Sequence, residues 1–134
     1  MIKLKDILFE VKSPSIFIPR RVEDRVERMI KQYIRNGSKG NLDLNGMNLT
    51  KLPDILKDII TVSGYFDCSL NKLKSLTGAP KTVGGDFACT QNQLTSLTGA
   101  PKTVGGDFFC FYNTVQFTEQ QVREVCDVKG RVIV

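Results

Sequence analysis

The sequence contains no histidine and no tryptophan. Histidine is the commonest general base and the commonest metal ligand in proteins, so its absence argues against most hydrolytic enzymes and most zinc sites. The four cysteines form no C-x-x-C pair, the spacing that is typical of compact metal and redox motifs. We therefore expect a protein that is not an enzyme and that uses no metal ion and no cofactor.

Long hydrophobic segments are also missing. A membrane-spanning helix needs about 18 to 20 apolar residues, and charged residues interrupt the apolar positions throughout this chain. At the N-terminus, Lys3, Lys5 and Asp6 break up what would otherwise be the apolar core of a signal peptide. These absences, together with cysteines that need no oxidising environment, predict a cytoplasmic protein without a membrane partner.

Charge is unevenly distributed along a chain whose length fits one structural domain. Of the 134 residues, 41% are hydrophobic, which is enough to build a core. Residues 1–40 contain ten Lys/Arg and five Asp/Glu, whereas residues 41–134 contain nine of each. The net charge of +5 therefore comes from the N-terminal third, which indicates two parts with different surfaces.

A repeat with a period of 21 residues occupies the middle of the chain. Residues 73–87 have the sequence LKSLTGAPKTVGGDF, and residues 94–108 differ from them only by Thr95 in place of Lys74. A further copy lies upstream, where Leu42 and Leu44 stand 24 residues before Phe66 and Cys68 and take their positions in the repeat. The same register relates three sets of residues: Phe66, Phe87 and Phe108; Cys68, Cys89 and Cys110; Asn71, Asn92 and Asn113. Such self-similarity predicts stacked units.

The repeated unit, Phe/Leu-x-Cys/Leu-x-x-Asn-x-Leu-x-x-Leu, resembles the leucine-rich-repeat family, whose motif is L-x-x-L-x-L-x-x-N/C-x-L. The resemblance covers residues 41–117. It implies a repeat solenoid of about four turns, with a parallel β-sheet of stacked turns that contributes one strand per turn to a concave face. The repeats are also similar to those of short bacteriophage and bacterial proteins, which implies a phage-type accessory protein in the host cytoplasm or a viral structural (virion) component.

The residue types support stacked turns independently of the resemblance. Phe and Cys at alternate positions of a strand would both point into the core. Leu73, Leu94 and Val115 are equivalent positions of the repeat. The asparagines would bond backbone groups of the turn, and stacking would align them in a ladder. Paired glycines precede the strands, so we interpret them as turn residues and not as a phosphate loop, which needs a helix after the glycines.

The segments that flank the repeats predict two caps. Residues 1–40 are expected to form an N-terminal helical cap, with a helix over 19–36. Its apolar stripe would consist of Val22, Val26, Met29, Ile30, Tyr33 and Ile34. Residues 118–134 are expected to form a C-terminal helix-strand cap that begins with a capping box at Thr118. In it, Val122, Val125 and Cys126 would face inward, residues 127–130 would turn, and residues 131–134 would close the sheet edge as a strand.

Alternation along the strands defines a candidate partner-binding surface on the concave face. If Phe66 and Cys68 point inward, residues 65, 67 and 69 point outward. Ser69 and Thr90 belong to this outward set. The proposed surface consists of Tyr65, Asp67, Asp86, Ala88, Asp107, Phe109 and Phe111. Exposed aromatic clusters mark interfaces, although the C-terminal helix could instead fold back over the two phenylalanines.

A basic patch on the N-terminal helix is a second candidate. Arg21, Arg25, Arg28 and Arg35 share one side of the predicted helix, away from its apolar stripe. Such a stripe could contact nucleic-acid phosphates. Asp24 and Glu27 interleave with it, which favours an ordinary solvated helix face.

Two further interpretations concern chemistry. The evenly spaced cysteines would fit a ligand or disulfide series, but packing as small apolar residues explains them more simply. Asp86 and Asp107 would lie about 5 Å apart on neighbouring strands, and a solvated repeat position explains this pair better than acid–base catalysis does.

Taken together, these patterns predict a non-enzymatic protein–protein interaction module that binds a host or self protein through its concave face. The alternative is a nucleic-acid-associated protein that uses the arginine stripe. A virion or other structural component, built by end-to-end stacking into a homo-oligomer, is the third possibility.

Overall fold

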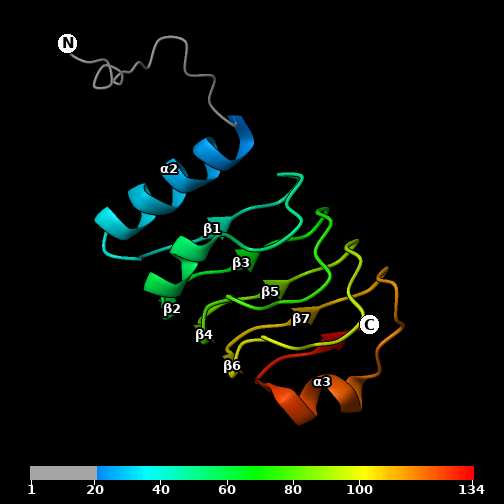
Figure 1. Cartoon of the computed structure of the whole chain (residues 1–134). Coiled ribbons are helices and arrows are strands. Elements are labelled where there is room, and N and C mark those ends of the chain that lie inside the picture. Colours follow the sequence, from blue (N-terminus) through cyan, green and yellow to red (C-terminus); the bar gives the residue numbers. More distant parts are fainter. Residues whose placement is uncertain (1–20) are drawn as a thin grey trace, which may run out of the picture.

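The computed structural model describes residues 21–134, which form a solenoid-like stack of short turns (Figure 1). Its strands build two parallel sheets, one with five strands in the order β1-β3-β5-β7-β9 and one with four in the order β2-β4-β6-β8. Because the two sheets take alternate strands, successive turns add one strand to each. In the described part of the chain, no helix has the length and apolarity needed to cross a membrane.

The elements are short. The five-stranded sheet contains β1 (Leu42–Asp43), β3 (Phe66–Asp67), β5 (Phe87–Ala88), β7 (Phe108–Phe109) and β9 (Val132–Ile133). The four-stranded sheet contains β2 (Thr61–Val62), β4 (Thr82–Val83), β6 (Thr103–Val104) and β8 (Asp127–Val128). The helices are α2 (Arg21–Arg35), the 3₁₀ helix η1 (Asp54–Asp58) and α3 (Glu119–Val125).

Strand pairing follows the sequence repeat. Phe66 pairs with Phe87, and Phe87 with Phe108, each 21 positions further on. The first and last turns are longer, because Leu42 pairs with Phe66 and Phe108 with Val132, 24 positions apart. Each longer turn contains a helix, η1 in the first and α3 in the last. The predicted 24-residue step at the N-terminal end is therefore confirmed, and the structure adds a second one at the C-terminal end.

The expectation of one strand per turn is wrong. The Thr-Val pair of each repeat forms a second strand, with the valine buried and the threonine facing out. A strand of two residues is too short to show an alternating pattern of its own. The four-stranded sheet therefore adds a second wall to the core, and in each turn only a short bend separates its strand from the strand of the predicted sheet.

The core is a column of equivalent residues from successive turns. Phe66, Phe87 and Phe108 are fully buried, and the ring centroids lie 5.7 Å and 4.9 Å apart along the stack. Cys68, Cys89 and Cys110 form a second buried column, and Val62, Val83, Val104 and Val128 a third. The prediction that residues 21 apart lie above one another, with Phe and Cys inside, is confirmed.

The asparagine ladder is also confirmed. Asn92 Oδ1 accepts the backbone N–H of Leu73 at 3.0 Å, and its Nδ2 donates to the carbonyls of Cys68 and Cys89. Asn71 and Asn113 make the corresponding bonds one turn before and one turn after. Each side chain thus joins two turns through backbone groups, and the bonds of Asn92 lie in the buried interior while those of Asn113 are partly buried.

Helix α2 lies over the first turn and packs against η1 (Figure 1). Val26, Ile30 and Tyr33 are buried, while Met29 and Ile34 are partly buried against the core. The Tyr33 hydroxyl donates to the carbonyls of Ser38 and Gly40, which fixes the exit from the helix. The observed helix agrees with the predicted one from residue 21 onward. Residues 1–20 and the side chain of Val22 lie outside the described residues.

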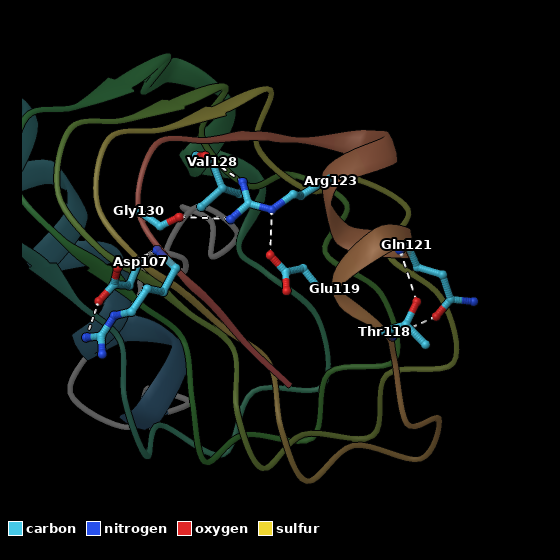
Figure 2. A network of polar contacts seen from close by, with 8 residues as sticks. Asp107, Thr118, Glu119, Gln121, Arg123, Val128 and Gly130 are labelled. Carbon is cyan, nitrogen blue, oxygen red and sulfur yellow. Dashed lines mark hydrogen bonds and ion pairs between the residues drawn. The ribbon is translucent and has the colours of Figure 1, made fainter.

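The C-terminal segment forms the predicted capping box, in which Thr118 and Gln121 exchange hydrogen bonds (Figure 2). Val122 and Cys126 are buried as expected, but Val125 is exposed, because the helix ends there and the extended backbone of Cys126 turns that residue inward. Arg123 donates to the carbonyls of Val128 and Gly130, which ties α3 to the strands that follow (Figure 2).

Two further expectations for this end are wrong. Residues 127–130 were expected only to turn, but Asp127–Val128 is strand β8, which pairs with β6. Val115, the supposed equivalent of Leu73 and Leu94, is exposed, and Phe117 is buried instead. After Asn113 the chain no longer follows the repeat, since the last turn is longer and contains α3. The predicted final strand is present as β9 beside β7.

Candidate functional site

The outward-facing residues of the five-stranded sheet form one continuous row. Strand pairing places the second residue of each strand side by side. We call this set the outer row: Asp43, Asp67, Ala88, Phe109 and Ile133. Polarity changes along it, from two carboxylates through a methyl group to two large apolar side chains. Binding surfaces commonly combine an apolar centre with a polar rim.

A shallow depression of about 220 Å³ lies in the middle of this face. Its lining consists of Tyr65, Phe66, Asp67, Asp86, Ala88 and Phe109. Five of these six were predicted as partner-binding residues, so the structure brings most of the predicted surface together. The hollow arises at Ala88, because its methyl group stands in the row where the neighbouring turns carry Asp67 and Phe109.

The remaining predicted residues of this surface behave differently. Asp107 and Phe111 do not line the depression. Phe111 is partly buried and lies against the ring of Tyr112 at 5.2 Å between centroids. Phe109 is also partly buried, with Ile133 of β9 beside it in the sheet. Neither full exposure nor full coverage therefore describes the two phenylalanines.

Ser69 and Thr90 do not face outward as predicted. Both are buried, and the Ser69 hydroxyl accepts the backbone N–H of Thr90 at 3.1 Å. The strands end after two residues, so strict alternation no longer applies two positions beyond them. The binding surface is thus narrower than the alternation implies.

Asp86 and Asp107 brace successive turns. Asp86 Oδ1 accepts the backbone N–H of Asp107 at 2.8 Å, and Asp107 Oδ1 accepts that of Arg131 at 2.7 Å. Asn41 Oδ1 does the same for Tyr65. A Cβ on Gly106 would collide with the Asp86 carboxylate, so glycine is needed one position before the braced amide. These bonds give the two aspartates a structural role in place of the simple solvated position that was expected.

Asp107 also forms an ion pair with Arg131, with 2.8 Å between Oδ2 and the guanidinium nitrogen. Hydrogen bonding to Arg131 lowers the pKa of the Asp107 carboxyl below its ordinary value. A lowered pKa means that the folded state favours the charged carboxylate. The associated stability is present above the pKa of the unfolded chain, about 3.9, and disappears as the pH falls through the folded-state pKa.

Replacing Asp107 with asparagine is expected to lower the melting temperature at pH 7, and the difference from wild type should shrink as the pH falls through the lowered pKa of the folded-state carboxyl. Asparagine keeps the oxygen that accepts the Arg131 amide, as Asn41 does for Tyr65. The effect should be small, because the pair is accessible to solvent. Melting curves between pH 2.5 and 7 measure it. A difference that stays constant across this range would show that the ion pair is not its cause, and Asp58→Asn, at an exposed position, is the control.

The basic patch is divided in the structure. Arg25 and Arg28 are exposed and line a hollow of about 520 Å³ between α2 and β1, which Asp43 also lines. Arg35 is not among its lining residues and donates to Gln32 on the same helix. The side chain of Arg21 lies outside the described residues. The predicted stripe of four arginines is therefore supported only at two positions, and these share their hollow with a carboxylate.

The cysteines are buried and free, as core packing predicts. Burial raises the pKa of Cys110 and Cys126 to about 11 and also raises that of Cys68 and Cys89. All four therefore remain thiols at neutral pH, whereas nucleophiles and metal ligands act as thiolates. Within residues 21–134, no group of three or more metal-ligating side chains of the Cys, Asp or Glu type lies together.

The sequence predicted the final strand β9 but not the part that its side chains take in this face. Arg131 pairs with Asp107, and Ile133 extends the outer row. A signal was present, because Gly130-Arg131-Val132 can be aligned with Gly106-Asp107-Phe108 at a step of 24 residues. The intervening helix and the loss of the asparagine concealed it.

Comparisons of the chain with protein-family models, with curated proteins and with solved structures found no match in any of the three. The surface itself therefore carries the functional argument.

Proposed function

We propose that this protein is a non-enzymatic interaction module that binds a partner protein on the outer face of its five-stranded sheet. The observation that carries the proposal is the depression at Ala88, which has aromatic and acidic walls and lies within a row that is apolar at one end. Aromatic side chains at a hollow surface are frequent anchors of protein interfaces. The braced turns hold this surface rigid, which lowers the entropic cost of binding.

The leucine-rich-repeat class and the two caps belong to the same proposal. The inward Leu and Asn positions of the repeats and the parallel pairing support the class. Helix α2 buries Val26 and Ile30 at the first turn, and α3 buries Val122 at the last, as caps of a solenoid would. A phage-type accessory role in the host cytoplasm is supported only by the amino-acid sequence of the repeats.

The nucleic-acid alternative has weaker support. Arg25 and Arg28 share their hollow with Asp43, and Glu27 is exposed between them on α2. Phosphate binding needs a net positive surface, and these carboxylates reduce it.

The proposal is tested by selecting twelve-residue peptides from a random displayed library on the folded chain. Ala88→Arg fills the depression and is expected to raise the dissociation constants of the selected peptides by at least about tenfold, which corresponds to about 1.4 kcal/mol in binding free energy. Thr82→Arg is the matched control, because Thr82 faces outward from the central strand β4 of the other sheet. Isothermal titration calorimetry with synthetic peptides measures both. If no peptide is selected, or if every peptide binds Ala88→Arg as well as wild type, the proposed surface is wrong.

A further inference from the structure

The depression combines two kinds of wall that suit one kind of side chain. Tyr65, Ala88 and Phe109 provide aromatic and aliphatic surface, and Asp67 and Asp86 provide two carboxylates beside it. Ala88 lies between Asp67 and Phe109 in the outer row, and Tyr65 belongs to the same turn as Asp67, so carboxylates and aromatic rings both line the hollow. A ligand that fills it must meet both.

The two carboxylates are held in place by their own backbone contacts. Asp67 Oδ1 accepts the backbone N–H of Ser69 at 2.8 Å, and Asp86 Oδ1 accepts that of Asp107 at 2.8 Å. The second oxygen of Asp67 accepts only a long bond of 3.3 Å from Asn45. The second oxygen of Asp86 has no hydrogen-bond partner among the side chains that the structure describes. The site therefore presents preoriented acceptors for a cation.

We propose that this depression binds an arginine or lysine side chain of the partner protein, an inference that rests on the proposed function and specifies its ligand. The aliphatic stem of such a side chain packs on Ala88 between the rings of Tyr65 and Phe109, because long basic side chains cover apolar surface while their charged ends stay polar. The cationic end then lies between Asp67 and Asp86, where it forms charge-assisted hydrogen bonds. The aromatic rings add attraction for a cation above their faces.

Charge complementarity selects this occupant over the others. An acidic partner segment would meet two fixed carboxylates, because Arg131, a cation that interacts with Asp86, lies outside the lining and is already paired with Asp107. A purely apolar side chain would bury the two carboxylates unpaired, which is costly. The apolar end of the outer row, at Phe109 and Ile133, continues beyond the depression. The preferred segment is thus a basic residue followed or preceded by large apolar residues.

The test uses peptides selected on the folded chain and dependent on Ala88. They are expected to share an arginine or lysine, and exchange of that residue for glutamine in a synthetic peptide should weaken binding by about tenfold or more. In the protein, Asp67→Asn together with Asp86→Asn should have a comparable effect. Asparagine retains the oxygen that accepts the backbone amide, as Asn41 shows at the position equivalent to Asp86, so the turn at Asp86 remains braced.

Asp58→Asn together with Asp127→Asn is the matched control, since it removes the same charge from exposed positions in η1 and in β8 of the other sheet. This variant should change the dissociation constant by less than about twofold. One contrary outcome is that the selected peptides depend on Ala88 but need no basic residue, and the other is that they bind the Asp67/Asp86 variant as tightly as wild type. Either result overturns the inference and leaves the proposed function intact. Absence of any Ala88-dependent peptide overturns both.

Discussion

Replacing Asn92 with alanine is expected to lower the free energy of unfolding by about 2 to 4 kcal/mol. The backbone N–H of Leu73 loses its acceptor, at a cost of about 1 to 3 kcal/mol, and the hydrogen bonds that the Asn92 amide donates are also lost. The side chain accepts the amide of Leu73 and donates to the carbonyls of Cys68 and Cys89. Asn92 is itself buried, so water cannot replace these bonds freely. A small domain has only about 5 to 15 kcal/mol in total, so this change removes a large fraction.

Urea unfolding followed by circular dichroism measures the effect. The exposed neighbour Gln93 is the control, because its side chain makes no hydrogen bond among the described residues and its alanine variant should lie within about 0.5 kcal/mol of wild type. A loss of less than about 1 kcal/mol for Asn92→Ala would show that the ladder contributes little to stability.

Replacing Phe87 with alanine is expected to lower the free energy of unfolding by about 3 to 5 kcal/mol, the usual cost of removing a buried phenyl ring. Phe87 is fully buried, with the rings of Phe66 and Phe108 on either side at 5.7 Å and 4.9 Å. Deleting the middle ring therefore opens a cavity between two turns, and both neighbours lose their aromatic contact.

The same urea experiment tests this expectation with two controls. Phe87→Leu keeps most of the volume and should cost less than about 1.5 kcal/mol. Tyr112→Ala removes a ring that is 73% exposed, and such surface substitutions usually stay within about 0.5 kcal/mol. Equal destabilisation by Phe87→Ala and Tyr112→Ala would contradict a continuous aromatic column.

Much of the stack could be predicted because the repeat is a direct measure of spatial period. Two segments that differ at one position must adopt the same turn, and their offset of 21 residues then equals one step of the solenoid. The inward direction of Phe87 and Cys89 and the bonding of Asn92 follow from this register and from strand alternation. For the candidate site, the same reasoning placed Tyr65 and Asp67 on one surface.

The errors occur where a residue's place depends on neighbours in other turns. Ser69 and Thr90 occupy positions at which strand alternation predicts exposure. They are buried, because the chain bends after the two-residue strands. Val125 belongs to a plausible inward set, yet as the last residue of the seven-residue helix it is exposed, and Cys126 after it is buried instead. Strand β8 keeps only the valine of the Thr-Val pair, 24 positions after Val104, so its pairing with β6 is what identifies it as a strand.

The sequence by itself determined the period, the inward columns of Phe, Cys and Asn, and the absence of histidine chemistry, because these properties repeat or depend on composition alone. Only the tertiary structure decided that a second sheet closes the core, that β9 extends the outer face, and that a hollow forms at Ala88. A hollow is a difference in size between side chains in adjacent turns, and it exists only once strand pairing has placed Asp67, Ala88 and Phe109 next to one another.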